Sequence, residues 1–497
     1  MNSKLKIKSG LVSHYKLAII ILLVWLVSPG AKAQRTLSLE EAIQIAQTSS
    51  PDIKKSKLNL FSNRKSLDAQ RAGLKSRFAL DITPIDYNQT RTFEPVLNQW
   101  NTYEDINSYT NFSISQPIVA TDGTISLNNT FRYQDRRTEY QNQQKQTYSN
   151  RLYLQIDQPI FTYNRNKLEL QELELNLENA EISNSLQLLT LERSVTQSFY
   201  SFYQRQNDLE IAQDEYENQL VSYEITQNKV DADLLAKEEL FQAELNLATS
   251  KSTLANSHVA LSNVADDFKF LLGINLDEEI AVDVDIKFIT HEVDLNRAIL
   301  YGLENRMELR QRKIEIERSQ FELTRTKGRN EFKGSISLSL GVIGDNENVS
   351  EIFQSPQNTP GVALSFSIPI WDWGANKARM EAANANLDIN KVDLEVQRND
   401  IIINIRKTYR SLQNLETQIV IAQQSVKNAE LTYDINLERY KNGDMISIDF
   451  NRFQIQLSTK KSELASALIN YKIELLNLKI LSLYDFVNQQ PVITPTN

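Results

Sequence analysis

Two stretches of this chain, 210 residues apart, begin in the same way. Residues 159–177 read PIFTYNRNKLELQELELNL, and residues 369–387 read PIWDWGANKARMEAANANL. In each stretch the first proline, Pro159 or Pro369, stands between alternating apolar residues and a long run of helix-forming residues. Proline fixes φ and removes a backbone donor, which suits the end of a strand where the chain turns into a helix. The repeated order of strand, proline corner and long helix predicts a fold that joins a sheet to long rods.

The similarity between the two halves extends over most of the chain. The shift of 210 residues also superposes Ile211-Ala212-Gln213 on Ile421-Ala422-Gln423, and a shift of 256 superposes Leu39, Ala42 and Ile43 on Leu295, Ala298 and Ile299. This is an internal duplication, and the difference between the shifts indicates a 46-residue insertion in the first half, before Pro159. We expect a first repeat over 34–273, a connector over 274–292, a second repeat over 293–486 and a short tail over 487–497.

Each half reads as a helix, a β section, a very long helix, a turn and a shorter helix. The chain has only 13 Gly and 11 Pro in 497 residues, so helices can run far without a break. The predicted helices cover 39–76, 164–230, 235–272, 294–331, 374–440 and 446–484. The longest, of about 66 residues, would extend about 100 Å, too far for one globular core. Packing along the rods is expected from apolar residues at intervals of seven, namely Leu168, Leu175, Ile182 and Leu189, with Ala378, Ala385 and Val392 at the matching places.

The β sections lie within 77–162 and 333–372 and alternate with period two, as in Val362, Leu364 and Phe366. This pattern is typical of half-buried strands in a soluble sheet and equally of lipid-facing barrel strands. We expect about two full-length strands in each half, near 124–135, 151–160, 334–343 and 361–370. Four strands cannot close a barrel, and lipid does not tolerate an open edge. Three copies would supply about twelve strands, so an obligate symmetric oligomer is predicted.

The first 33 residues read as a secretory signal peptide. Lysines precede an apolar run from Leu17 to Val27, and the small-residue pattern Ala31-Lys32-Ala33 follows. The run is shorter than the roughly 20 residues of a membrane-spanning helix, so the mature chain is expected to begin near Gln34. The chain has no cysteine, which excludes disulfides and a lipid-bearing cysteine at the mature terminus.

Charge and composition argue against several classes of function. The formal charge is −9, and removal of the five lysines of the signal peptide brings it to −14, which makes nucleic acid a poor partner. The mature chain has only His258 and His291, too few for a zinc site. We find no phosphate-binding loop or nucleophile elbow. The sequence therefore predicts neither an enzyme nor a cofactor.

Several segments resemble the TolC-like outer-membrane efflux protein family, the outer membrane factors of tripartite efflux and type I secretion systems. The resemblance runs to about Phe486 and is carried by Leu37-Ser38-Leu39-Glu40-Glu41-Ala42-Ile43, Gln158-Pro159-Ile160-Phe161, Ile368-Pro369-Ile370-Trp371 and Glu438-Arg439-Tyr440-Lys441-Asn442-Gly443. It implies an α+β membrane protein: a trimeric, twelve-stranded transmembrane β-barrel in the Gram-negative outer membrane, continued into the periplasm by a coiled-coil tunnel. Such a homotrimer, surrounded by outer-membrane lipid, is an exit duct that docks on a periplasmic adaptor (membrane fusion) protein fed by an inner-membrane transporter.

The resemblance also assigns site residues. Tyr440 and Asp449 match family positions at the periplasmic entrance, where Arg452 replaces a second acidic residue and is expected to pair partly with Asp449. The hairpin tips, which would dock the adaptor, contain Ala232, Asp233, Asn442 and Gly443. Gly443 suits the left-handed residue that reverses the chain; since Asp233 is not glycine, we expect the tips to differ in shape. Pro159 and Pro369 mark the strand-to-helix corners, and Phe161, Trp371 and Trp373 beyond them suit either a membrane interface or a core.

Two other classes of protein remain open at this point. A secreted coiled-coil scaffold or adhesin with a soluble β cap would also have a signal peptide and rods, although four strands make a poor core in one copy. A periplasmic adaptor would have one helical hairpin flanked by small β domains, whereas this chain has two copies of a strand-and-hairpin unit.

Overall fold

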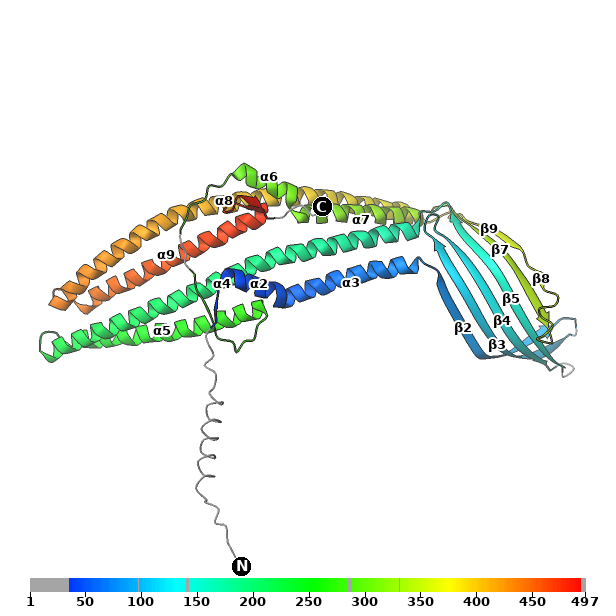
Figure 1. The fold of residues 1–497 in the computed structure, drawn as a ribbon, viewed down its shortest axis with the longest axis horizontal. Helices are drawn as coiled ribbons and strands as arrows, with labels where there is room; N and C mark the ends of the chain where they lie inside the picture. Colours follow the sequence, from blue (N-terminus) through cyan, green and yellow to red (C-terminus); the bar gives the residue numbers. More distant parts are fainter. Residues whose placement is uncertain (1–34, 97, 140–142, 285–287, 330, 493–497) are drawn as a thin grey trace, which may run out of the picture.

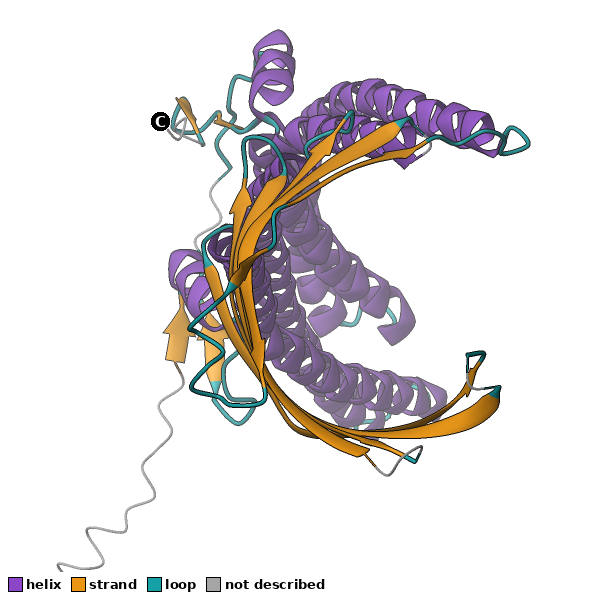
Figure 2. Ribbon diagram, turned by 90° about the vertical axis from the view of Figure 1, so that its right-hand side faces the viewer, coloured by secondary structure: helices purple, strands orange, loops and turns teal. Residues whose placement is uncertain are grey.

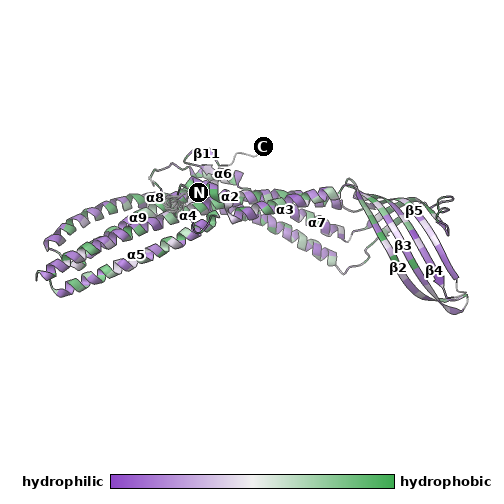
Figure 3. Ribbon diagram, turned by 60° about the horizontal axis from the view of Figure 1, so that its bottom comes forward, coloured by the Kyte–Doolittle hydropathy of each residue, from purple (hydrophilic) through white to green (hydrophobic). Residues whose placement is uncertain are grey.

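The computed structural model describes residues 35–96, 98–139, 143–284, 288–329 and 331–492. The predicted signal peptide lies outside these residues. Long helices form one end of the molecule and a single large sheet forms the other (Figure 1). None of the described helices combines the length and hydrophobicity that a membrane span requires, and Figure 3 shows hydrophilic and hydrophobic residues mixed along every rod.

The helices repeat in the two halves as the duplication predicts. The first half contains α2 (Leu39–Ser49), α3 (Pro51–Gly73), α4 (Arg165–Asp231) and α5 (Lys237–Leu272), and the second contains α6 (Leu295–Asn305), α7 (Met307–Arg329), α8 (Ala375–Asn442) and α9 (Ser447–Ser482). The shift of 256 carries α2 and α3 onto α6 and α7, and the shift of 210 carries α5 onto α9. The predicted long rods are confirmed. The bounds drawn between the two repeats and the connector stay predictions.

Two helices predicted as continuous, 39–76 and 294–331, are each broken. Ser50 has extended ψ because the following Pro51 disfavours helical backbone at its predecessor. The second break, at Arg306, has no proline. There the side chain pairs with Glu308 and donates to the carbonyl of Ile480 in α9 at 3.2 Å. Each break lets a short helix pack against the middle of the rods.

The sheet is six strands wide and antiparallel throughout. Its order is β2 (Arg77–Glu94), β3 (Gln99–Ile118), β4 (Gly123–Thr138), β5 (Gln143–Ile160) and β7 (Lys333–Asn346), after which β9 (Gly361–Ser367) and the two-residue β8 (Gln357–Asn358) pair with the same side of β7 at different heights. The prediction of two full-length strands in the first half is therefore wrong, because four are present. The count of twelve strands in three copies, which rested on it, does not follow from this sheet.

The two additional strands account for the 46-residue insertion. A shift of 256 places Arg77, the first residue of β2, on Lys333 at the start of β7, and a shift of 210 places Gly123, the first residue of β4, on the same lysine. The inserted residues are thus 77–122, which form the β2–β3 hairpin and the turn after it. Sequence reasoning missed this hairpin because polar residues dominate its far half and Pro84 interrupts β2.

The core lies near the middle of the rods. One apolar cluster centres on Phe199, Phe202 and Phe268 of α4 and α5 and includes the short parallel strands β1 (Arg35–Leu37) and β6 (Ile280–Val282). A second cluster gathers Tyr471 of α9, α6 and Tyr484 of β10 (Tyr484–Asp485), which pairs with β11 (Gln490–Pro491). The rods are therefore fixed at mid-length, and their far ends depend on fewer contacts.

Between the core and the sheet, four helices lie side by side in the order α3, α4, α7, α8. Arg71 of α3 bonds Glu174 of α4 at 3.0 Å, and Asn390 of α8 donates to Ser319 of α7 at 2.6 Å. Arg310 of α7 binds Glu178 of α4 through both carboxylate oxygens, at 2.5 and 2.8 Å, and holds the pKa of that carboxyl below its usual range. Helices and sheet follow one curve that is open on one side (Figure 2).

We expect Gly273→Ala to destabilise the fold. Gly273 ends α5 with φ +73°, and a Cβ there would collide with the carbonyl group of Ser49 at the α2–α3 break. The left-handed backbone alone costs an alanine about 1–2 kcal/mol, so the thermal midpoint in detergent should fall by several degrees. Gly73→Ala is the matched control, because nothing lies within 4 Å of its Cβ and its φ is not positive. Equal midpoints for the two variants would contradict this prediction.

Candidate functional site: the tips of the helical hairpins

The two hairpin tips have nearly the same backbone. Asp233 follows α4 with φ 57°, and Gly443 follows α8 with φ 85°. At each tip the next amide closes the turn on a carbonyl five residues back, Leu234 on Lys229 at 2.8 Å and Asp444 on Arg439 at 2.9 Å. The prediction that the tips differ in shape is therefore wrong. Aspartate is among the few residues that adopt the left-handed conformation at modest cost, so the turn does not need glycine.

Ala232 and Asn442 hold equivalent places beside these turns. Ala232 caps the end of α4, where its amide bonds the carbonyl of Asn228 at 3.1 Å, and Asn442 is the last residue of α8. Ala232, Asp233, Asn442 and Gly443 are all exposed. The tips thus present short polar loops to the surroundings at the end of the molecule farthest from the sheet (Figure 1).

Tyr440, two residues before the end of α8, connects the two hairpins. Its side chain is 1% exposed, and its ring stacks on Phe450 of α9 with centroids 4.7 Å apart. Its hydroxyl shares hydrogen bonds with Thr226, at 2.5 Å, and Ser222, at 3.2 Å, both in α4. From the same helix Lys229 donates to the carbonyl of Tyr440 at 2.7 Å. The predicted entrance tyrosine therefore holds α8 and α9 against α4 within one chain.

A second polar contact joins the hairpins farther from the tip. The buried amide of Gln219 in α4 donates to Gln454 of α9 at 3.1 Å and to Asn451 at 2.5 Å. Because hydroxyls and amides dominate these buried contacts, separating the hairpins would let water replace most of the bonds. Segments held in this way lie at the low-stability end of a fold. The tip is thus held less strongly than the apolar core at mid-length.

Asp449 and Arg452 lie in the first turns of α9, and both side chains are exposed. No ion pair joins them in the part of the chain that the structure describes, so the expected partial pairing is not formed. Asp449 instead lies at the N-terminal end of α9, where the helix dipole favours a negative charge. In one copy the two residues contribute opposite charges to the surface beside the tip.

The tyrosine two turns before Tyr440 provides a contrast. Tyr433 also stacks on Phe450, at 5.7 Å, but its hydroxyl donates to the exposed side chain of Asn218, at 3.2 Å, and interacts with Gln454. Burial is the main cause that raises the pKa of Tyr433, and burial raises the pKa of the Glu215 carboxyl nearby. The Tyr433 phenol therefore stays neutral at physiological pH and serves as a donor.

The strand-to-helix corners lie at the other end of the rods. Pro159 is still within β5, opposite Ser335, whereas Pro369 follows the end of β9 by two residues. Phe161, Trp371 and Trp373 are 62%, 74% and 89% exposed. Of the two predictions for these aromatics, a place in the core of a single chain is wrong. An interfacial position stays a prediction.

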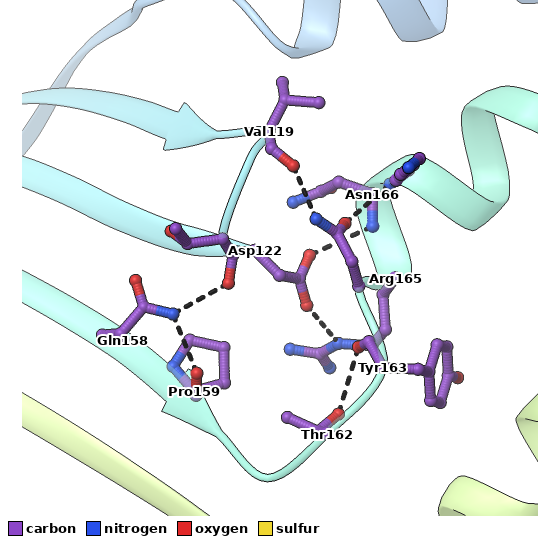
Figure 4. A network of polar contacts seen from close by, with 11 residues as sticks. Val119, Asp122, Gln158, Pro159, Thr162, Tyr163, Arg165 and Asn166 are labelled. Atoms are coloured by element: carbon purple, nitrogen blue, oxygen red, sulfur yellow. Dashed lines mark hydrogen bonds and ion pairs between the residues drawn. The ribbon is translucent and has the colours of Figure 1, made fainter.

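A polar network that the sequence did not reveal surrounds the first corner (Figure 4). Asp122, in the turn between β3 and β4, accepts bonds from the Nε of Arg165 at 3.1 Å and from the amide of Asn166 at 3.0 Å. Asn164, which caps α4, donates to the carbonyl of Val119 at 2.6 Å. A capping asparagine is readable from sequence, but the turn that it holds belongs to the missed insertion.

No group of three or more His, Cys, Asp or Glu that could hold a metal lies within the described ranges. What the site offers is mechanical: two hairpins closed on each other by Tyr440 and Gln219, with a carboxylate and a guanidinium beside them.

Tyr440→Phe should loosen the tip without unfolding the rods. The variant keeps the ring stacking but removes the hydroxyl from Ser222 and Thr226, a loss of about 1 kcal/mol for a typical bond. Amide hydrogen exchange in 219–231 should then become about fivefold faster. Tyr409→Phe, which loses an exposed bond from Gln413 within α8, is the control and should change little. If both variants exchange at the wild-type rate, Tyr440 does not hold the hairpins together.

Known proteins share this architecture. Residues 302–482 match the family model described as outer membrane efflux protein. Outer membrane protein TolC of Escherichia coli (strain K12) is 23% identical over 359 residues, which cover 69% of this chain and 71% of TolC. The structure of the Campylobacter jejuni CmeC outer membrane channel matches with a TM-score of 0.70 at 14% identity, covering 92% of this chain and 87% of CmeC.

The outer membrane protein VceC of Vibrio cholerae matches with a TM-score of 0.67 at 13% identity, over 89% of this chain and 95% of VceC. At such identities these structures establish the fold. The match to the family model and the similarity to TolC extend this likeness from the fold to the sequence. The chain is thus similar to the TolC-like outer membrane efflux proteins, and these comparisons support a location in the Gram-negative outer membrane, extending into the periplasm.

Proposed function

We propose that three copies of this chain form a closed duct through which substrates leave the periplasm, as the exit part of a tripartite efflux pump or type I secretion system. One observation carries this proposal. The sheet and the layer of helices each have two edges without a partner, and the edges of the sheet lie on the same two sides of the molecule as those of the helices. On one side α3 leads directly into β2, and on the other β9 leads into α8. Each side is an unfinished interface.

Both outer helices expose apolar residues at coiled-coil spacing. On α8, Ile389, Val392, Val396 and Ile403 are 46–62% exposed and follow one another at intervals of three, four and seven. On α3, Leu58 and Phe61 are 68% and 59% exposed. Such stripes require a partner helix. A head-to-tail contact between α8 of one copy and α3 of the next repeats around an axis and closes into a ring.

The sheet edges support the same arrangement. In a membrane an unpaired strand edge leaves N–H and C=O groups without partners, at several kcal/mol for each group. Strand β9 runs opposite to β7, and β2 runs opposite to β3, so across six strands β9 of one copy meets β2 of the next in antiparallel orientation. A soluble scaffold or adhesin, the alternative, would leave the apolar residues of both edge strands in water.

The hairpin tips are the proposed contact with the other pump components. We assign the exposed loops around Ala232, Asp233, Asn442 and Gly443 to docking of the periplasmic adaptor protein. An inner-membrane transporter would supply the energy, so the duct itself needs no catalytic residues. Three copies of Tyr440 would keep the hairpins closed, and three copies of Asp449 would surround the entrance.

Assembly can be tested in detergent. The protein should need detergent for extraction from membranes and should then have the mass of three chains by light scattering. Lys313→Glu, a charge change at an exposed position of α7, which lies between α4 and α8 away from both edges, serves as a control and should leave the mass unchanged. Val392→Asp, in the α8 stripe, should release smaller species. A stable wild-type monomer or dimer would exclude the duct.

Charge variants test the entrance. In planar bilayers Asp449→Ala should weaken the preference for cations and the block by multivalent cations, because a ring of like charges attracts counterions. Arg452→Asp should strengthen both, and Tyr440→Phe should raise the open conductance. Unchanged selectivity in both charge variants, in channels shown to be trimeric, would remove Asp449 from the constriction.

A further inference from the structure

We propose that the inserted β2–β3 hairpin is part of the barrel wall, so that the trimer closes an eighteen-stranded barrel through a seam between β2 of one copy and β9 of the next. This inference rests on the proposed trimer and adds to it the composition of the pore wall. The alternative is that β4 forms the seam with β9, as in the second half of the duplication, while the hairpin folds away from the wall.

The strand register shows that the hairpin continues both faces of the sheet. One row of paired positions, taken strand by strand from β2 to β7, is apolar throughout: Phe78, Ile114, Leu127, Leu154 and Leu340. The adjacent row on the opposite face is polar throughout: Arg77, Ser115, Ser126, Gln155 and Ser339. An apolar outer face and a polar inner face are what a barrel strand needs. A hairpin lying inside the pore or in water would not need a lipid-compatible face.

Polar contacts fix the inserted β3 to β4 on the inner face. Arg136 of β4 binds Asp105 of β3 at 2.7 Å, Gln134 donates to the same carboxylate at 3.0 Å, and Arg132 donates to Asn107 at 2.8 Å. Asp105 and Arg136 are directly opposite in the register, on the face that carries Ser115 and Ser126. A charged ladder of this kind is costly toward lipid and ordinary in a water-filled lumen. The inserted strand therefore lines the pore.

A β-bulge keeps the outer face of β2 consistent. The register with β3 shifts by one residue between Thr83 and Asp86, at Pro84. As a result Asp86 pairs with Asn107 on the polar face, and Tyr87 pairs with Ile106 on the face of Phe78 and Ile114. At this height the latter face also carries Tyr133, Tyr148 and Asp135, whose carboxylate accepts bonds from Gln144. Without the bulge Asp86 would point toward lipid. Aromatic residues at this height suit the interfacial girdle of a barrel.

The hairpin is also fixed at its base. Its return turn binds the first turn of α4 through Asp122 and Asn164, and Gln158 of β5 donates to the carbonyl of Thr121 at 2.8 Å (Figure 4). At its other end β2 begins four residues after α3. The edge strand β2 and the edge helix α3 therefore lie on the same side of the chain. A neighbouring copy that contacts α3 would also contact β2.

The dimensions agree with this seam. Three sheets, each six strands wide, supply eighteen strands, an even number within the range of outer-membrane barrels. Strands about 4.8 Å apart and tilted by about 40° then give a circumference of about 110 Å, and twelve helices about 9 Å apart give about the same. The barrel would continue the tunnel without narrowing.

Disulfide crosslinking tests the seam in the intact protein, which has no native cysteine. Leu80→Cys on β2 is combined in turn with Val362→Cys, Leu364→Cys and Phe366→Cys on β9, because the three β9 positions cover the possible registers. The matched control is Leu127→Cys on β4 with the same three partners. Paired strands bring Cβ atoms to about 5 Å, near disulfide range, and each intervening strand adds about 5 Å. After oxidation in membranes, at least one Leu80 pair should give at least about tenfold more covalent trimer than any Leu127 pair.

The outcomes separate this inference from the proposed function. If light scattering finds no trimer, the duct itself fails. If the protein is trimeric but the Leu127 pairs crosslink, the duct stands and the eighteen-stranded wall is overturned. Trimers in which every Leu80 pair stays reduced, although its cysteines react with a maleimide, would overturn it as well.

Discussion

The structure depends on one constraint: in lipid, every backbone N–H and C=O group needs a partner. The sheet of one chain satisfies this along five of its strand contacts and leaves β2 and β9 each with one bare edge. The helices next to the sheet also have two edges without a partner, since α3 and α8 expose apolar residues on the same two sides. In the proposed duct a single chain is thus a segment of a wall, which a ring of copies would complete.

The duplication explains how one structural unit, used twice, gives the chain both of its pairs of long helices. Each half supplies a pair of rods fixed at mid-length by an apolar cluster, around Phe199 and Phe268 in the first half and around Tyr471 in the second. Beyond the clusters the contacts between the hairpins become polar, through Tyr440 and Gln219. The apolar clusters hold the rods firmly at mid-length, and the polar contacts hold the tip less strongly, which suits the proposed opening of the duct at that end. The insertion of 77–122 changed one half only, and it did so by adding a complete hairpin, which keeps the number of strands even.

The sequence was informative about the helices because scarce glycine and proline, the two repeat shifts and the proline corners all agree. It was less informative where one signal is ambiguous. Beyond Ile82 most residues of β2 are polar on both faces, apart from Ile85, Tyr87 and Phe93. Its period is therefore weak, and Pro84 argues against a strand. The prediction of differently shaped tips failed for another reason. Asp233 was expected to avoid the left-handed conformation because it is not glycine, but aspartate can adopt that conformation. The spacing of Asp449 and Arg452 allowed an ion pair, but two exposed side chains gain too little from pairing to be held together.

The proposed duct is a three-fold ring whose wall is continuous from the membrane to the hairpin tips. Electron cryo-microscopy of the wild-type protein in lipid nanodiscs would show this wall in a section across the sheet. We expect three-fold symmetry and eighteen strands in one closed circle, with β2 of each copy beside β9 of its neighbour. A ring of another symmetry, or a sheet that remains open between copies, would contradict it.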